Sequence, residues 1–359
     1  MKKIYYITAV FATLFLVGCG DGIDLPGVNV ETDLNKIPLP DNNVNLEQVE
    51  LKPSTEPMLH EGLHTEEDFQ RIRDKKAAGE EPWVSAYQLL VESQFSQKTA
   101  DTYPTEWIKR GISGDENYMN AARGATIVYQ QALRWKIEQD DEYAAKAVEN
   151  LNKWVQTCVG VTGNTNLSLA AGLYGYEFAI AGELLRDYEG WDRADFAAFQ
   201  NWLLKVFYPA NDDFLKRHHD TNALHYWANW CLCNIAAKMA IGIVTDRRDI
   251  YNEGIDHLQT GDTNGRLRRA IYHDYAPDYN FAQWQESGRD QGHTLMCVGL
   301  MGVICQLAWS QGDDFFAYDD NLFMRACEYA ACCNYTNETV PYTTYIWQKQ
   351  SQWGYPIPE

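Results

Sequence analysis

Four uncharged polar residues recur at helical spacing in the segment HHDTNALHYWANWCLCN, residues 218–234. They are Asn222, His225, Tyr226 and Asn229. Their positions i, i+3, i+4 and i+7 predict one face of a helix that begins after Asp220 or Thr221. A solvated helix face is usually rich in Lys and Glu. Amide, imidazole and phenol groups therefore indicate either a buried polar network or a group that moves protons.

The segment QESGRDQGHT combines an arginine and a histidine at the predicted start of another helix. Ser287 followed by Asp290 resembles a capping box, which predicts a helix from about Gly288. Arg289 and His293 would then lie one turn apart, with a glutamate just ahead of them. Because arginine offers a bidentate fork and a helix N-terminus favours anions, this pair could clamp a carboxylate. The alternative is a structural network in which Arg289 pairs with a neighbouring acid.

The segment RLRRAIYHDYAPDY, residues 266–279, interleaves basic residues with tyrosines. Such a loop suits a polyanionic sugar chain, because cations attract the charge and aromatic rings can stack on sugar faces. The alternative is a solvated loop. A weaker candidate is the glycine-rich segment 163–178, which contains two asparagines. The residues expected to contact a substrate are Glu286, Gln283, Trp230, Asn164, Arg268 and Tyr275.

These residue types suit the removal of a proton next to a carboxylate. Negative charge builds up on an already charged group, so the site must neutralise the carboxylate with Arg, an amide or a protonated His. It also needs a base and an acid close together, and Tyr and His can fill both roles. This is β-elimination on a uronic-acid polymer, and we expect no metal and no cofactor. The predicted catalytic residues are His225, Tyr226, Asn222, Asn229, Arg289, His293 and Tyr272.

Two other functions remain open at this stage. A glycoside hydrolase would require a pair of carboxylic acids on the cleft face and would release saturated reducing ends. Its activity would depend on a carboxylate such as Glu286 or Asp290. A non-catalytic glycan-binding protein would bind without turnover and depend on aromatic residues. The polar stripe contains no carboxylate, which argues against the hydrolase, while the binding protein stays open as an alternative.

The elements that must hold these residues are predicted to be helices. β-branched alternation is scarce, and no glycine fingerprint follows a strand. Helices joined by short polar turns predict an all-α fold of helical hairpins, an α/α toroid or an open solenoid. The lack of a fixed-period repeat argues against the solenoid. The predicted helices are 65–75, 82–97, 117–138, 141–158, 166–187, 192–206, 220–243, 246–260, 288–311 and 319–335, with the stretches 261–287 and 336–359 irregular.

The bulk composition fits one large exported enzyme. The chain has 359 residues, is 45% hydrophobic and carries a formal net charge of −20, which argues against nucleic acid as a partner. Lys2 and Lys3, an apolar run and the sequence LVGC match a bacterial lipoprotein signal with Cys19 as the lipidated residue. We expect a signal at 1–19, a linker at 20–58 and a catalytic domain at 59–359. The expected location is the periplasm or outer-membrane surface of a Gram-negative bacterium, with membrane attachment only through the lipid.

Eight further cysteines occur after the signal. Their close pairs, CLC and CC, do not have the spacing of metal ligands, and all of them fall within apolar helical patterns. We therefore expect them to be small core hydrophobes.

Several of these segments resemble a known family. HYWANW, the downstream TDRRDIYNEGIDH and RRAIYHDY resemble the α/α-toroid alginate lyases. QESGRDQGHT, AWSQGDD and EYAACCNYTNETVPY resemble the broader alginate lyase domain family, with similarity to polysaccharide lyase families 5 and 38. The resemblance covers roughly residues 60–342. It implies an α/α toroid, a polyuronate substrate such as alginate or glucuronan, and elimination without a metal.

The resemblance also implies roles for particular residues. In the best-known alginate lyases of this shape, adjacent Asn and His precede a Tyr-Trp pair, and the Asn neutralises the carboxylate. Here Asn222 is four residues before Tyr226 and His225 directly precedes it, so Asn229 is an alternative neutraliser. The family's Arg and catalytic Tyr fit Arg266 or Arg268 with Tyr272 only loosely, so Arg289 and His293 are expected to form the clamp.

Overall fold

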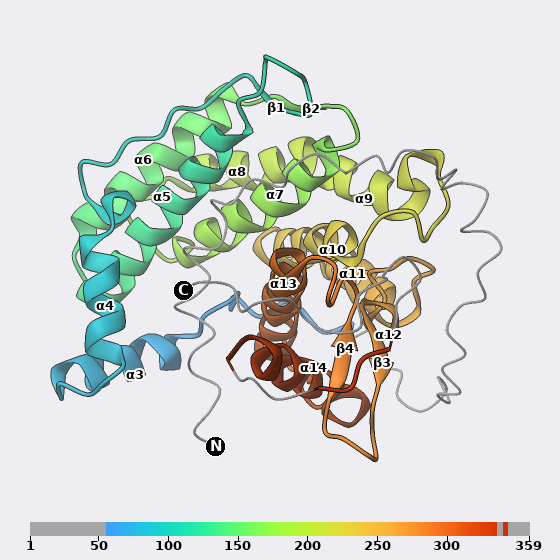
Figure 1. Cartoon of the computed structure of the whole chain (residues 1–359). Helices are drawn as coiled ribbons and strands as arrows, with labels where there is room; N and C mark the ends of the chain where they lie inside the picture. The colour runs from blue at the N-terminus through green and yellow to red at the C-terminus, as the bar shows by residue number, and fades with distance from the viewer. Residues whose placement is uncertain (1–54, 336–339, 344–359) are drawn as a thin grey trace. The chain divides into compact units, whose positions relative to one another are not determined.

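The computed structural model describes residues 55–335 and 340–343 (Figure 1). The chain divides into two compact units, each built from separated segments. Of the described residues, the helical unit comprises 55–214 and 236–254, and the hairpin unit comprises 215–235, 255–335 and 340–343. The predicted lipidation site Cys19 and most of the predicted linker lie outside the described residues.

The described part of the helical unit consists of packed helices and one small parallel sheet. Strands β1 and β2 pair in register from Trp107 with Gly160 to Arg110 with Gly163, and helices α5 and α6 lie between them in the sequence. Helix α5 packs against both α6 and α7 (Figure 1). The elements are α3 (Glu66–Ala77), α4 (Trp83–Glu92), the 3-10 helix Gln94–Ser96, β1 (Trp107–Arg110), α5 (Tyr118–Glu138), α6 (Asp141–Thr157), β2 (Gly160–Gly163), α7 (Leu167–Leu184), α8 (Arg193–Val206) and α9 (Tyr208–Arg217).

Capping residues fix where several of these helices begin. Thr65 and Asp68 form a reciprocal capping box at α3, with the Asp68 amide donating to the Thr65 hydroxyl at 3.2 Å. Asp140 accepts from the Glu142 amide at 3.0 Å at the start of α6. Each cap satisfies a backbone N–H that has no partner within its helix.

The core of the helical unit is aromatic. The ring of Phe178 lies 5.4 Å from that of Trp154 and 5.2 Å from that of Trp202, which in turn is 5.1 Å from Phe207. All four side chains are buried. Aromatic pairs at such distances stabilise a core beyond their buried area.

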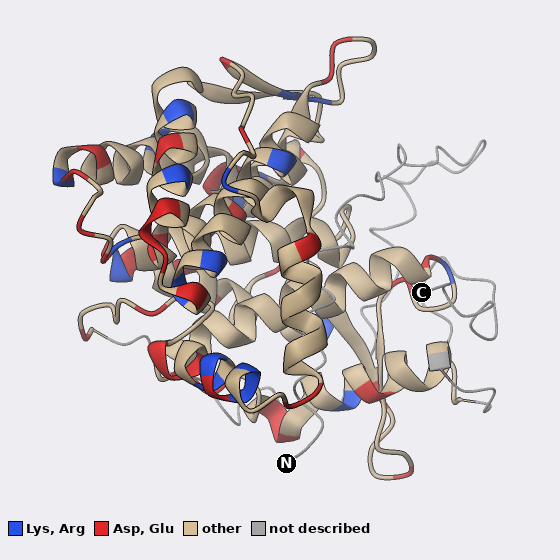
Figure 2. Cartoon of the chain, turned by 90° about the vertical axis from the view of Figure 1, so that its left-hand side faces the viewer, with Lys and Arg blue, Asp and Glu red and all other residues tan. Residues whose placement is uncertain are grey.

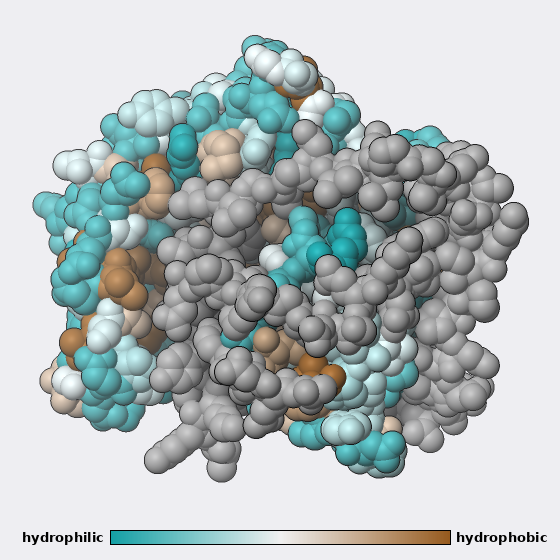
Figure 3. Space-filling view, viewed as in Figure 1, coloured by the Kyte–Doolittle hydropathy of each residue, from teal (hydrophilic) through white to brown (hydrophobic). Residues whose placement is uncertain are grey.

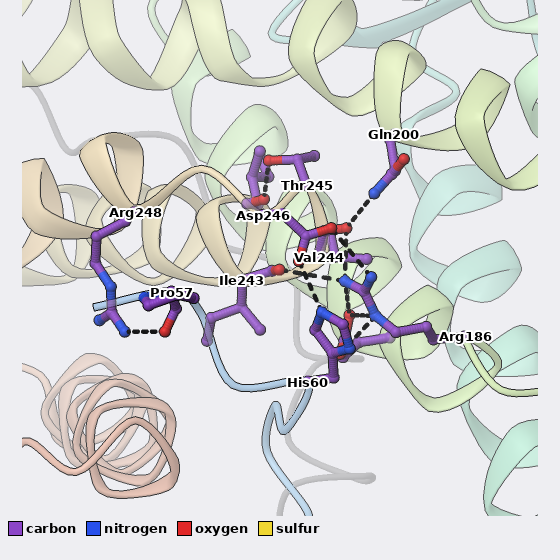
Figure 4. A network of polar contacts seen from close by, with 11 residues as sticks. Pro57, His60, Arg186, Gln200, Ile243, Val244, Thr245, Asp246 and Arg248 are labelled. Carbon is purple, nitrogen blue, oxygen red and sulfur yellow. Dashed lines mark hydrogen bonds and ion pairs between the residues drawn. The ribbon is translucent and has the colours of Figure 1, made fainter. Parts of the chain in front are cut away.

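An ion-pair network anchors the first described segment to the helices of this unit (Figure 4). Arg186 is buried and pairs with Glu183 at 2.8 Å and Asp246 at 3.2 Å, while also donating to the Val244 carbonyl at 2.9 Å. His60 lies 3.0 Å from Asp246. A buried arginine with several acceptors links the segments that carry those acceptors.

The hairpin unit holds the two segments that the sequence singled out. Strands β3 and β4 pair antiparallel, with Ile271 opposite Trp284 and Asp274 opposite Ala282. Helix α14 packs on the strands, and the Trp284 indole donates to the Ala326 carbonyl at 3.0 Å. The elements are the 3-10 helix His218–Asp220, α10 (Ala228–Val244), α11 (Arg248–Thr260), α12 (Leu267–Ala270), β3 (Ile271–Asp274), β4 (Ala282–Trp284), α13 (Gln291–Ser310) and α14 (Tyr318–Tyr335). Helices α9, α10 and α11 each continue from one unit into the other.

Helix α13 is apolar enough, by length and composition, to cross a membrane. However, 56% of its most apolar window is buried inside the protein, as in a core helix. The eight cysteines after the signal are free, and six of them are buried. The burial of these six agrees with the prediction of core residues, whereas Cys327 and Cys332 are half-buried.

The surface mixes charges of both signs. Lys and Arg lie among Asp and Glu on the described helices (Figure 2). The described part of the face in Figure 3 is mainly hydrophilic, with separate apolar patches.

Most predicted helices are present, but two predicted starts are wrong. The helix expected from 220 begins at Ala228, and the helix expected from 288 begins at Gln291. Helix α9 was not predicted. Pro209, just after the predicted helix 192–206, stands in the first turn of α9, where proline is tolerated. The four strands were not predicted, because strands of three or four residues have no readable alternation. The predicted helix 82–97 ends at Glu92 and is followed by a 3-10 turn.

Candidate active site

Three of the four residues of the polar stripe precede helix α10, because side chains form hydrogen bonds with the backbone groups that a longer helix would use. The Asn222 carboxamide accepts from the Leu224 amide at 2.8 Å, which makes an Asx turn. Asn264 donates to the carbonyls of Leu224 and Tyr226 at 3.0 and 2.9 Å. The amide of Ala228, which a longer helix would bond to Leu224, donates to a glutamine side chain at 3.1 Å. Residues 221–227 are therefore turns, and neither Asp220 nor Thr221 caps α10.

The turns gather aromatic and imidazole rings around a buried tyrosine. The Tyr226 ring is 4.7 Å from Trp230, 4.8 Å from His225, 5.7 Å from His219 and 6.1 Å from His218. Tyr226 is buried, while His225 and Trp230 are half-buried. The structure thus brings three of the predicted site residues into one cluster and adds two histidines that the prediction omitted. The adjacent histidine pair ahead of the stripe was the signal for them.

The backbone at the two added histidines is strained. His218, His219 and Asp220 have φ values of 49°, 53° and 59°, in the left-handed region. Each non-glycine residue in that region costs roughly 1–2 kcal/mol. Burial, followed by the charges of His219 and His225, lowers the pKa of His218 to about 4. His218 is therefore neutral at pH 7, and its Nε2 lies 3.5 Å from the Cys231 sulfur.

Asn229 differs from Asn222 in its surroundings. Asn229 is 1% exposed in the first turn of α10, and its Nδ2 lies 3.8 Å from the sulfur of Met296 on α13. Its Oδ1 is buried and has no hydrogen-bond partner among the described residues. A buried amide oxygen without a partner is uncommon and marks a position where a bound group or water could donate.

The arginine of the predicted clamp is held between a carboxylate and an indole ring. Arg289 Nη1 donates to Oε1 of Glu286, and the guanidinium carbon lies 4.6 Å from the centre of the Trp227 ring. The Arg289 side chain is 35% exposed, whereas that of Glu286 is 1% exposed. The predicted alternative, a pair between Arg289 and Glu286, is thus present. The pair still leaves part of the Arg289 side chain accessible to solvent.

Helix α13 begins three residues later than its predicted capping box implies. Glu286 and Gly288 have φ values of 64° and 78°, which interrupts helical backbone before Gln291. Asp290 is the N-cap, and its Oδ1 accepts from the His293 amide at 2.9 Å. Arg289 therefore precedes the helix and does not share a helical face with His293.

His293 is tied to the same N-cap. Asp290 Oδ2 lies 2.6 Å from His293 Nδ1, and the His293 side chain is 25% exposed. The hydrogen bond from the His293 side chain is the main cause that lowers the pKa of Asp290 to about 2. An ionised Asp290 accepts from Nδ1–H and so fixes the orientation of the His293 ring.

Because Asp290 both caps α13 and orients His293, Asp290→Ala is expected to lower the free energy of unfolding by more than about 1 kcal/mol, the usual value of one N-cap. The pKa of Asp290 is held at about 2, below its ordinary value of 3.8, so this contribution is present above about pH 4 and is lost as the pH falls toward 2. Urea unfolding at pH 7 measures the effect. Asp192→Ala, which removes a cap without a histidine partner, is the control. Equal losses in the two variants would contradict the role of His293.

The predicted tyrosines of the basic segment are engaged by the chain near its C-terminal end. Tyr272 is 4% exposed, and its hydroxyl donates to the Thr343 carbonyl at 3.0 Å. The Tyr275 hydroxyl donates to Gln283 Oε1 at 2.6 Å, and Gln283 Nε2 donates to the Thr343 carbonyl at 2.9 Å. Burial raises the pKa of Tyr272 well above its usual range, so the phenol keeps its proton at neutral pH. These three side chains form one polar group, in which Tyr272 and Gln283 are buried and Tyr275 is half-buried.

The remaining predicted contacts have different surroundings. Arg268 forms an ion pair with Asp319. Asn164 belongs to the helical unit, where its Oδ1 accepts from the backbone and side-chain amides of Asn166 at 2.9 Å. Trp227, whose ring packs against the Arg289 guanidinium, was not among the predicted site residues, although it directly follows Tyr226.

Comparison with known proteins follows from this fold and site. The alginate lyase family model matches residues 73–338. A complex of a histidine-to-alanine variant of alginate lyase A1-III with a tetrasaccharide has a similar structure, with a TM-score of 0.60, 13% identity, and coverage of 78% of this chain and 82% of that chain. Alginate lyase A1-III from Sphingomonas species A1 has a TM-score of 0.54 at 12% identity, covering 77% of this chain and 79% of that one. An alginate lyase from Bacteroides ovatus has a TM-score of 0.50 at 14% identity, covering 75% and 82%. No functionally curated protein matches the chain.

The fold class is therefore all-α and of the α/α-toroid type, as predicted. The family match extends over most of the sequence, so the chain belongs to the alginate lyase family. The protein is an enzyme, a polysaccharide lyase.

Proposed function

We propose that this enzyme cleaves alginate or a related polyuronate, such as glucuronan, by β-elimination. The observation that carries the proposal is the partly exposed guanidinium of Arg289, held over Trp227 and joined to Glu286 through one N–H. None of its other N–H groups forms a hydrogen bond with another described residue, so the fork can receive a carboxylate in bidentate geometry.

The uncharged cluster around Tyr226 supports the proton chemistry. In this proposal His225 or Tyr226 takes the C5 proton, and a tyrosine protonates the O4 leaving group. Of the candidate tyrosines, Tyr226 lies in the ring cluster with His225, whereas the Tyr272 hydroxyl donates to the Thr343 carbonyl. Neutral groups suit this task because they add no negative charge beside the carbanion that forms next to a carboxylate.

Neutralisation of the substrate carboxylate would fall to Arg289 and His293, assisted by an asparagine. Asn229 is better placed than Asn222, since Asn222 is committed to an Asx turn while Asn229 lies beside α13. The amide nitrogen of Asn229 has only a long contact to sulfur and can turn to a stronger acceptor.

Incubation with alginate and with glucuronan tests the function. Elimination creates a double bond between C4 and C5, so ultraviolet absorbance should rise with time on at least one polymer. Saturated reducing ends without this absorbance would indicate a glycoside hydrolase. Binding without either product would indicate a glycan-binding protein. A folded sample that produces no absorbance on any polyuronate would contradict the proposal.

We also propose that the enzyme is exported and anchored by a lipid on Cys19, in the periplasm or at the outer-membrane surface of a Gram-negative bacterium. The LVGC sequence supports this. Cys19→Ala is expected to abolish incorporation of labelled palmitate in cells and to release the protein from the membrane fraction. A Cys158→Ala variant, which alters a buried core cysteine, controls for the loss of a thiol. Unchanged palmitate labelling of Cys19→Ala would contradict the anchor.

A further inference from the structure

Glu286 is a buried acid with a hydrogen bond from the described residues to only one of its two carboxyl oxygens. Its side chain is 1% exposed, and it stands in a left-handed turn, with a φ of 64°, between β4 and α13. Oε1 accepts from Arg289, but Oε2 is buried without a partner in the part of the chain that the structure describes. An ionised oxygen that has neither water nor a donor is costly, and a proton on Oε2 removes most of that cost.

The charged groups around Glu286 act in opposite directions. Burial raises its pKa to about 7, while His293 and Arg289 lower it and Asp290 raises it further. From α13 the Cys297 thiol also faces it, and its own pKa is raised by burial, with Glu286 contributing. Glu286 can therefore change its protonation near neutral pH, where the enzyme would work.

The protonation state of Glu286 determines how much of the positive charge of Arg289 is available to a ligand. An ionised Glu286 forms an ion pair that neutralises the guanidinium from its buried side. A protonated Glu286 still accepts one hydrogen bond from Nη1 through Oε1 and leaves the positive charge uncompensated. In both states the Trp227 ring, 4.6 Å from the guanidinium carbon, packs against the guanidinium group.

We propose that Glu286 is a positioning residue that holds Arg289 over Trp227 and, when protonated, leaves its charge available to the carboxylate of a uronate sugar. This rests on the proposed function. It assigns to Glu286 a role through Arg289 and no contact with the sugar. The consequence is that the affinity for a polyuronate falls as Glu286 ionises.

The test compares wild-type enzyme with Glu286→Gln over pH 5.5 to 8.5, roughly the range on either side of the expected titration. Glutamine keeps an acceptor for Arg289 and imitates the protonated acid. We expect the wild-type KM for a polyuronate to rise at least about fivefold across this range, the scale of one partly exposed ion pair. In Glu286→Gln the KM should lack this rise, while kcat should change much less.

Two further variants separate positioning from packing. Glu286→Ala removes the acceptor that holds Arg289 and should raise KM at every pH. Glu189→Gln, the same change at an exposed turn residue, should leave the wild-type pH profile intact. If Glu286→Ala does not fold, the comparison with Glu286→Gln still decides the matter. A wild-type-like KM profile in Glu286→Gln would overturn the proposal.

A second measurement does not depend on activity. Carbon-13 NMR of enzyme labelled at the glutamate carboxyl carbon, with the signal assigned by its loss in Glu286→Gln, gives the titration of Glu286 directly. A midpoint near neutrality supports the inference, and a Glu286 that stays ionised down to pH 5.5 overturns it. If the wild type shows no elimination on any polyuronate, the proposed function fails, and the titration still reports separately on Glu286.

Discussion

Replacing Arg289 with alanine is expected to lower kcat/KM on a polyuronate by at least about 100-fold, or about 2.7 kcal/mol, the scale of one lost oxyanion donor. The physical reason is that elimination builds charge on the sugar carboxylate, and Arg289 is the partly exposed cation whose fork can neutralise it. Arg289→Lys keeps the charge but loses the planar fork and the stacking on Trp227. It should therefore fall between wild type and alanine.

Arg289→Ala should remain folded, because the buried carboxylate that it leaves behind can take up a proton. Circular dichroism and urea unfolding at pH 6 check this. Arg247→Ala, which removes a half-exposed arginine paired with Asp249 on the surface, is the matched control and should keep wild-type activity. A folded Arg289→Ala enzyme with near-wild-type kcat/KM would exclude Arg289 from the neutralising clamp.

Glu286 is expected to make the stability of the enzyme fall as the pH rises toward 8. Its pKa in the folded protein is raised from 4.5 to about 7 by burial, so folding favours the protonated form. The stabilising contribution is complete below about pH 4.5 and is lost as the pH rises through 7. A shift of this size corresponds to about 3 kcal/mol between the two limits.

Urea unfolding at pH 5 and pH 8 measures this contribution. Glu286→Gln carries no ionisable group, so its stability relative to wild type should increase between the two pH values by up to about 3 kcal/mol. Glu189→Gln, at an exposed position, should keep a constant difference from wild type. A constant difference for Glu286→Gln as well would show that Glu286 has the same pKa in the folded and unfolded chains.

The residue types of the site could be read from the sequence, but their geometry could not. The segments 218–234 and 283–294 were identified because Asn, His, Tyr and Arg stood where Lys and Glu are usual. The helical face that was expected to align them does not exist before Ala228. Side chains from Asn264 and Gln285, which are 35 or more positions further along the chain, take the backbone groups of residues 224–228. No local sequence pattern predicts hydrogen bonds between such distant segments.

The same contrast between residue types and geometry applies to the predicted clamp of Arg289 and His293. Arginine and histidine near a helix start were visible in QESGRDQGHT, and so was the possible pair between Arg289 and Glu286. The left-handed residues Glu286 and Gly288 delay the helix, so Arg289 turns to Trp227 instead of sharing a face with His293. Propensity could not show this, because a non-glycine residue with positive φ is held there by its tertiary surroundings.

The sequence by itself determined the helical class, most helix boundaries, the burial of the cysteines and the family, because hydrophobic periodicity and short motifs are local properties of the chain. Only the tertiary structure decided which polar groups meet. It placed Tyr226 among four rings, engaged Tyr272 with Thr343, and buried Glu286 beside an arginine that remains partly exposed. The reason is that burial and hydrogen bonding between distant segments set the charge and direction of each side chain, and neither can be read from spacing along the chain.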